Sequence, residues 1–252
     1  MSFARSPALA LVACACLASG AHAAPVAKLR VSFDPDIAGG RTTIRLALRV
    51  RGSGGATPSP LRSLALRLPP GMGIATSTLG QANCEPARLI HGGLRGCSEN
   101  ARVGRGEATA VVPVGATSLP EKASLDALMG PAREDRLEVL FYVQALSPVF
   151  AQLVFASVVE EDRLPYGEQL DASIPLIQAW PEGPDMALEA FAFSIGPAGL
   201  TYHRQVNGRT VSYRPRGVRL PRSCPRGGFP FGALLSFQDG THESAVYHVP
   251  CP

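Results

Sequence analysis

The sequence contains very little lysine and few aromatic residues. Of its 24 basic residues only Lys28 and Lys122 are lysine, so the formal net charge of +4 rests mainly on arginine. With 26 glycines and 23 prolines, this composition indicates the coding bias of a GC-rich genome rather than a surface selected for polyanions. Nucleic acid is therefore not expected as a partner.

Beyond residue 23 the chain lacks any apolar run long enough to cross a bilayer as a helix, which takes roughly 20 residues. The first 23 residues read as a signal peptide: Arg5, the apolar run Ala8–Ala18 and the small-x-small triplet Ala21-His22-Ala23. The mature chain would begin near Ala24. A second interpretation is a lipobox ending in Cys14, which would give a lipid anchor. Either way we expect a secreted or cell-envelope-associated protein.

Motifs of the common catalytic and metal sites are also missing. The chain has no Gly-x-Ser-x-Gly elbow, no His-Glu-x-x-His, no Cys-x-x-Cys and no glycine-rich phosphate loop between a strand and a helix. The adjacent acids at 160–162 are typical of a solvated turn, and His91 and His203 have no recognisable partner in the sequence. We therefore expect no catalytic residues, no metal and no cofactor.

Six cysteines are present, and two of them, Cys14 and Cys16, fall in the signal peptide. An even number of cysteines in an exported chain implies disulfides, here two. The four that remain are Cys84, Cys97, Cys224 and Cys251. Four cysteines allow three pairings, and the simplest joins Cys84 to Cys97 and Cys224 to Cys251.

Strict alternation of apolar and polar residues predicts strands along most of the chain. The expected strands cover residues 42–51, 64–68, 103–114, 137–146, 150–160, 174–179, 186–195, 200–206 and 209–213. Residues 72–100 are expected to be irregular, and 120–131 to form a linker. The pair 137–146 and 150–160 is the most apolar and is expected to be central.

Two hairpins follow from turn chemistry. Asn207-Gly208 fits a type I′ turn that places Tyr202 opposite Tyr213. Near the end, Gly240 fits the left-handed position of a three-residue loop, which puts the odd-numbered apolar residues of 229–237 and 245–249 on one face. This hairpin brings Cys251 near Cys224. The fold class expected is all-β: an antiparallel β-sandwich, jelly-roll or immunoglobulin-like, with two disulfides. Residues 24–252 are expected to form one domain, the alternative being two small sandwiches divided near residue 120.

A basic cluster interleaved with proline is the most notable local feature. Its members are Arg214, Arg216, Arg219, Arg222 and Arg226. Arginine forks suit phosphate or carboxylate, so a cell-envelope polymer is a conceivable partner; another surface protein is the alternative. An arginine-biased surface loop explains the cluster equally simply. Trp180, before a Pro-Glu-Gly-Pro turn, is interpreted as a core cap or, alternatively, a sugar-stacking platform.

Several segments together resemble a known group of sequences. They are Leu68-Pro69-Pro70-Gly71, Gly96-Cys97-Ser98, Tyr166-Gly167, Ile174-Pro175, Cys224-Pro225-x-Gly227-Gly228-Phe229-Pro230-Phe231, and Val249-Pro250-Cys251-Pro252. The chain is similar to uncharacterised secreted β-rich proteins of GC-rich Gram-positive bacteria, with the C-terminal Cys-to-Cys hairpin as the most specific part. This resemblance implies a secreted β-sandwich but implies no particular activity.

The sequence thus favours a non-catalytic structural or binding module of unknown ligand. Two other functions compete with it. One is a glycan-active enzyme on a jelly-roll scaffold, which needs two carboxylates about 5–10 Å apart in a cleft. The other is a polyanion-binding module that uses the 214–226 cluster.

Overall fold

The computed structural model describes residues 25–72, 77–114, 117–132, 136–147 and 150–251, and most of their secondary structure is β-strand. The expected signal peptide and Cys14 lie outside the described residues. The strands are β1 (Val26–Asp34), β2 (Arg41–Arg51), β3 (Leu61–Leu68), β4 (Arg102–Val114), β5 (Thr117–Met129), β6 (Glu138–Ala145), β7 (Ala151–Glu161), β8 (Glu168–Ser173), β9 (Ala187–Ile195), β10 (Tyr202–Val206), β11 (Arg209–Tyr213), β12 (Val218–Arg219), β13 (Phe229–Phe237) and β14 (His242–Val249). One α-helix, α1 (Pro86–Gly92), and three short 3₁₀ turns, Ser53–Gly55, Gly93–Gly96 and Glu99–Ala101, complete the list.

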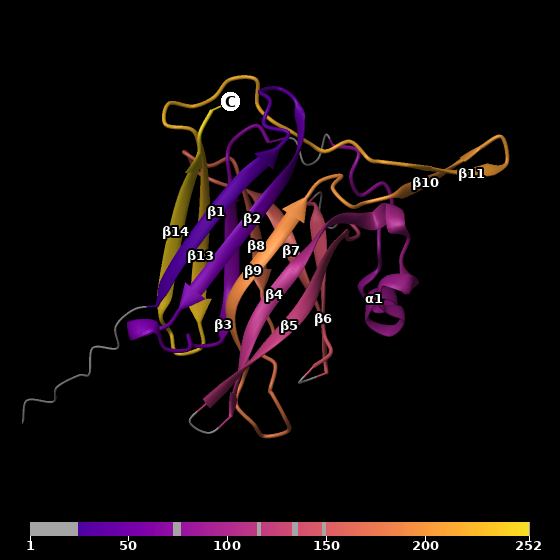
Figure 1. Ribbon diagram of the computed structural model, residues 1–252. Coiled ribbons are helices and arrows are strands. Elements are labelled where there is room, and N and C mark those ends of the chain that lie inside the picture. The colour runs from indigo at the N-terminus through magenta and orange to yellow at the C-terminus, as the bar shows by residue number, and fades with distance from the viewer. Residues whose placement is uncertain (1–24, 73–76, 115–116, 133–135, 148–149, 252) are drawn as a thin grey trace, which may run out of the picture.

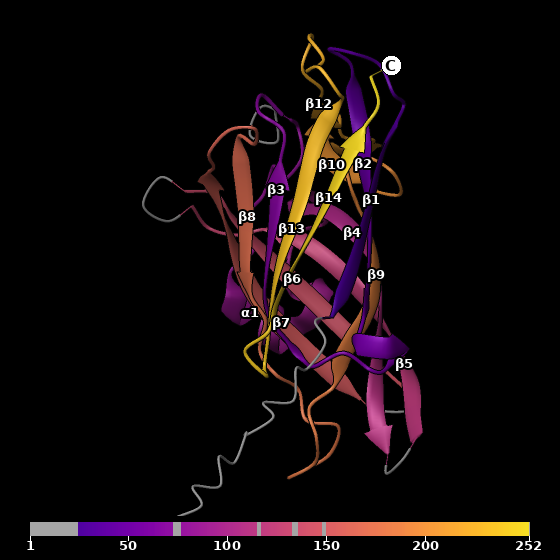
Figure 2. The same ribbon diagram turned by 90° about the vertical axis from the view of Figure 1, so that its left-hand side faces the viewer.

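A single antiparallel sheet of 12 strands forms the body of the molecule, in the order β1-β2-β9-β4-β5-β6-β7-β8-β3-β13-β14, with the short β12 added beside β2. The sheet curls until its end strands, β1 and β14, lie against each other without a ladder of hydrogen bonds (Figures 1 and 2). It is therefore nearly closed into a barrel. The expected β-sandwich is wrong, because alternation shows that one face of each strand is buried but not whether a second sheet or the curled sheet itself buries it.

The core lies inside the curled sheet. In β2 the alternating residues Ile44, Leu46, Leu48 and Val50 are at most 3% exposed and point inward, as their period of two requires. At one end Phe33 packs against Phe229 and Phe231, with ring centroids 5.7 and 5.9 Å apart. These aromatic side chains are at most 8% exposed and form the core at this end. The opposite end is packed differently, as described below.

Three segments differ from the expectation. Residues 117–129 form the long strand β5 rather than a linker, although Pro120 lies within it. Pro120 lies opposite Val111, outside the β5–β6 ladder, which begins only at Ala123, so its missing N–H breaks no bond on that side. The strand expected at 174–179 is instead a loop with one bridge, between Gln178 and Asp185. The strand before it, β8, was not expected because its sequence is short and polar.

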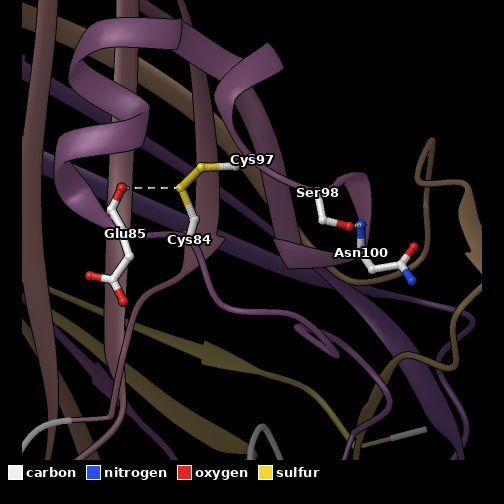
Figure 3. Close-up of a disulfide and its surroundings, with 5 residues drawn as sticks. All are labelled: Cys84, Glu85, Cys97, Ser98 and Asn100. Carbon is white, nitrogen blue, oxygen red and sulfur yellow. Dashed lines mark hydrogen bonds between the residues drawn. A yellow bond between two sulfur atoms is a disulfide. The ribbon is translucent and has the colours of Figure 1, made fainter.

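A helical segment covers the outer face of β5, β6 and β7. Leu89 of α1, Cys84 and Ala101 pack against Leu128 and Leu140, all at most 1% exposed. The disulfide Cys84–Cys97, with Cα atoms 5.4 Å apart, closes this segment (Figure 3). Strand β6 is therefore covered on both faces, which explains its continuous apolar run from Val139 to Val143. The expected central place of β6 and β7 in the sheet is confirmed.

Both expected hairpins are confirmed. Strands β10 and β11 form a separate two-stranded arm, with Tyr202 opposite Tyr213 and Asn207 at a φ of 51° (Figure 1). In the last hairpin Phe229 lies opposite Val249, and Gly240 has a φ of 81°. The second disulfide, Cys224–Cys251, ties the base of that hairpin, its Cα atoms 5.9 Å apart. Both disulfides follow the local pairing and are consistent with an oxidising extracellular environment.

Candidate functional site: an apolar cavity inside the sheet

A cavity of about 170 Å³ lies inside the curled sheet, in the half away from the Phe33 cluster. Its walls come from β3 to β9 and from the loop between β8 and β9. The rings of Phe141, Phe155 and Phe193 form its deep end, with Phe141 stacked on Phe155 at 5.2 Å and 5.9 Å from Phe193. Because the lining extends to Ala110, Ala145, Ala151 and the β8–β9 loop, we place its opening at the connections β4–β5, β6–β7 and β8–β9. These connections lie together at the lower end of Figure 1.

Small side chains create this cavity. Six of the inward positions that line it carry alanine: Ala108, Ala110, Ala123, Ala145, Ala151 and Ala172. Positions of the same inward rows nearer the middle of the sheet carry large residues such as Leu125, Phe141 and Phe155. Where the inward-facing side chains change from large to small towards one end of a strand, they leave the interior unfilled at that end. Sequence reasoning missed this cavity, although the alanines at inward positions of five strands were its signal.

One carboxyl group lines the otherwise apolar wall. Glu121 of β5 is fully buried, at 0% exposure, and is the only ionisable residue among the described residues of the lining. On the inward row of β5 it follows Leu119, which is 45% exposed near the opening, and precedes Ala123 and Leu125 deeper inside. The carboxyl group is therefore buried but lies closer to the opening than Ala123 and Leu125 do.

Exposed apolar side chains lie at the same end of the sheet as the opening. They lie in or next to the same three connections and are between 41% and 69% exposed: Val114 and Leu119, Leu146 and Phe150, and Trp180. We call these five residues the apolar rim. Trp180 was expected either to cap the core or to offer a stacking platform; it is 44% exposed and lies on the β8–β9 connection. Large apolar groups gathered at one place on a surface mark binding sites more often than isolated ones do.

The basic cluster lies far from this cavity in the fold, on the segment that leads from the β10–β11 arm to β13. All five arginines, Arg214, Arg216, Arg219, Arg222 and Arg226, are exposed. None of them forms an ion pair with a residue that the structure describes. Arg219 lies beside Arg41 in the β12–β2 pairing, so a sixth basic residue joins the cluster.

A second group of polar side chains was not apparent in the sequence. His203 of β10 lies between Ser212 of β11, with Oγ 3.1 Å from Nδ1, and Glu99, with Oε2 2.8 Å from Nε2. These are the residue types of a serine hydrolase triad, but serine faces Nδ1 and the carboxylate Nε2, the reverse of the usual arrangement. The His203 and Glu99 side chains are 40% and 57% exposed, so solvent screens the pair. None of the three lines the cavity.

The acids at 160–162 are not simply a solvated turn. Asp162 accepts two hydrogen bonds from Arg67, at 2.5 and 2.8 Å, and its side chain is only 10% exposed. Glu160 pairs with Arg136 at 2.6 Å. Asp162 and Glu160 are therefore paired with arginines at the end of β7, and they do not form a pair of carboxyl groups facing a cleft.

No group of three histidine, cysteine, aspartate or glutamate residues is placed to hold a metal ion within the described part of the chain. Among those same residues there is also no helix of the length and apolarity needed to span a membrane. Comparisons of the chain with protein-family models, with curated proteins and with solved structures give no match.

Proposed function

We propose that this protein is a secreted or envelope-associated, non-catalytic binding protein that holds a small apolar molecule inside its curled sheet. The observation that carries the proposal is the cavity itself: about 170 Å³, walled by apolar side chains and open at one end. Ligand sites are typically concave and mostly apolar, with few polar groups. The apolar rim extends this surface beyond the opening.

The size of the cavity limits the ligand. An engineered apolar cavity of about 150 Å³ in another protein stays dry and binds benzene. The cavity here is slightly larger, so it suits one ring or a short alkyl chain, with the remainder of a longer molecule at the rim. Burial of apolar surface contributes about 25 cal/mol per Å² and would supply most of the binding free energy.

The test is calorimetric titration of the purified protein with 1-octanol, a neutral apolar ligand. We expect saturable binding at one site. Ala151→Phe, which places a ring in the cavity, should abolish binding. Ala156→Phe is the matched control, because Ala156 lies on the same strand but is exposed and outside the cavity. Absence of binding to the wild-type protein, or equal loss in both variants, would contradict the proposal.

The non-catalytic part of the proposal has its own test. Ser212, His203 and Glu99 are the strongest arrangement for hydrolysis among the described residues, because their hydrogen bonds already connect a hydroxyl, a base and an acid. Hydrolysis of nitrophenyl esters should be no faster with the wild-type protein than with Ser212→Ala. Turnover that is abolished by this substitution would show an enzyme instead. The cavity does not support the glycan-active alternative. Such an enzyme needs two carboxyl groups, and the described lining of the cavity holds one.

A second candidate function, polyanion binding, is supported by the exposure of the five clustered arginines. Their charges are not neutralised by described acids, and Arg41 lies beside them. Substitution of the five by glutamine should lower the salt concentration that elutes the protein from a polyphosphate matrix. Substitution of Arg30, Arg49 and Arg51, exposed on β1 and β2, is the control. Unchanged elution of the five-fold variant would refute this function.

A further inference from the structure

The β10–β11 arm is a two-stranded ribbon that projects from the body of the molecule (Figure 1). Residues 204–212 are all exposed, and Val206 and Val211, at 41% and 39%, share one face of the ribbon. A lone hairpin is only marginally stable in water, and a third strand with an apolar face stabilises it. The arm is therefore a small sheet that gains stability when another strand is added.

Strand β11 has a free edge. Val206 pairs with Arg209 across the two-residue turn, so this pair and every second pair beyond it are hydrogen-bonded within the ribbon. Thr210 and Ser212 belong to the intervening pairs, whose N–H and C=O groups point away from the partner strand. None of the described residues bonds to the backbone of Thr210 or Ser212 at this edge. The edge is accordingly a template for pairing with another chain.

The outer edge of β10 is already occupied at its base. Asn100 bonds to both the N–H and the C=O of His203, which lies opposite Ser212. This contact confirms that the backbone groups of the His203–Ser212 pair point outward. It also keeps another strand from lying along the whole of β10, so the open edge is the one on β11.

Charge selects the kind of strand that fits this edge. The sequence has no aspartate or glutamate from residue 190 to residue 238, a stretch that includes the arm and the basic cluster. Arg209 lies at one end of β11 and Arg214 follows its other end. Arg204 reaches across the ribbon, with its guanidinium carbon 5.3 Å from the centre of the Tyr213 ring on β11. The arm of a second copy would meet repulsion here, whereas acidic side chains on the added strand would be attracted.

From this arrangement we infer that β11 binds an extended acidic segment of a partner protein as a third, antiparallel strand. Main-chain hydrogen bonds to Thr210 and Ser212 supply affinity, and the arginines select acidic side chains. The inference is independent of the apolar cavity, so failure of 1-octanol to bind leaves it intact. It shares Arg214 with the polyanion candidate but requires a peptide backbone, which an anionic polymer such as polyphosphate lacks.

The experiment titrates the purified protein into the fluorescein-labelled peptide Glu-Glu-Thr-Val-Thr-Glu-Glu at low salt and follows fluorescence anisotropy. The threonines of the peptide then lie opposite Thr210 and Ser212, and its valine lies opposite Val211. N-methylation of both threonines removes the N–H donors that face β11 and should weaken binding roughly 5- to 100-fold, the effect of two hydrogen bonds. N-methylation of the valine and of the glutamate after the second threonine is the matched control. Those N–H groups point away from β11, so binding should persist.

Two proline variants test the same edge from the side of the protein. Thr210→Pro and Gln205→Pro both lose the side-chain bond between these residues, and both remove an N–H that points out of the ribbon. Only Thr210 lies on β11. Thr210→Pro should therefore weaken binding of the unmodified peptide roughly 2- to 10-fold, and Gln205→Pro should not.

Three outcomes would overturn the inference. The unmodified peptide does not bind, or the threonine-methylated peptide binds as tightly as its control, which would show attraction by charge alone and favour the polyanion candidate. In the third outcome, sedimentation velocity shows self-association that Thr210→Pro abolishes, so that a second copy occupies the edge. The comparison of methylated peptides uses the wild-type protein and stands even if the proline variants do not fold.

Discussion

The side chain of Asn100 exchanges two hydrogen bonds with the backbone of His203, as a neighbouring strand would. Its Nδ2 donates to the His203 carbonyl at 2.7 Å, and its Oδ1 accepts from the His203 N–H at 2.8 Å. Asn100 lies on the segment that carries the first disulfide (Figure 3), so this contact joins that segment to the base of the β10–β11 arm. Tyr202, fully buried beside it, accepts from the Gly80 N–H and donates to the Arg102 carbonyl. The arm is therefore anchored at its base.

Replacing Asn100 should loosen the arm without unfolding the sheet. Asn100→Ala removes both hydrogen bonds, each of which contributes about 0.5–1.5 kcal/mol. Hydrogen exchange at the amides of β10 and β11 should accelerate, while exchange in β6 stays slow. Gln205→Ala removes only an exposed side-chain bond to Thr210 and serves as control. Equal exchange in the two variants would show that Asn100 does not anchor the arm.

The two disulfides should stabilise the fold to different extents. They close loops with sequence separations of 13 and 27 residues, and the chain-entropy model gives about 3 and about 3.6 kcal/mol for such loops. Cys84→Ser with Cys97→Ser should also uncover the outer face of β6, because that loop carries Leu89 over Leu140. We expect limited proteolysis within residues 84–101 in this double variant. Cleavage there at the wild-type rate would contradict the role of the crosslink.

The Arg67–Asp162 pair should make stability fall in acid. The two hydrogen bonds from Arg67 hold the pKa of Asp162 below its ordinary value. Because the folded-state pKa is depressed, the stabilisation is present above the ordinary aspartate range and is lost as pH falls below about 4. Asp162→Asn should lose about 1.5–3 kcal/mol near neutral pH, the value of a hydrogen bond to a charged group. Urea unfolding at several pH values should show that the difference in free energy of unfolding between Asp162→Asn and wild type decreases as the pH is lowered.

Glu168 should have the opposite pH dependence. Burial raises the pKa of its carboxyl group, and its Oε2 accepts no hydrogen bond from any described residue. The folded state therefore favours the protonated form, so stability is complete below about pH 4.3 and decreases as pH rises through the raised pKa. Glu168→Gln should be more stable than wild type at pH 7, by about 1 kcal/mol, with no gain at pH 4. A gain of equal size at both pH values would point to packing rather than charge.

Local patterns in the sequence predicted most elements but not how they assemble. The alternation in β2, the Asn207-Gly208 turn and the Gly240 loop are decided by residues close together in the chain. The closure of the sheet depends on β1 meeting β14, more than 200 residues away, and no local period encodes it. One partner of His203 likewise lies on a distant segment: Glu99 is 104 residues away.

The cavity was harder to predict than any strand. Glu121 falls in a stretch that resembles a linker because of Pro120, and its neighbour in the ladder, Ala110, gives no sign of a binding site alone. Only the shared orientation of six alanines on five strands shows that the interior is unfilled. That orientation follows from the strand registers, which the sequence does not fix for strands distant along the chain.

The apolar rim should matter only for ligands longer than the cavity. A series of alcohols from butanol to dodecanol should gain about 0.8 kcal/mol per buried methylene until the cavity is full, and longer members should then continue onto the rim. Leu146→Ser with Phe150→Ser removes the two most exposed rim residues, at 68% and 69%.

In that double variant butanol should bind as in wild type, because the phenylalanine rings at the deep end are unchanged. Decanol and dodecanol should lose affinity, since their outer methylenes remain in water. Val206→Ser with Val211→Ser is the matched control, because these exposed residues, at 41% and 39%, lie on the β10–β11 arm and outside the lining. A loss that is uniform across chain lengths would mean that the substitutions disturb the cavity itself, and the rim would then have no separate role in binding.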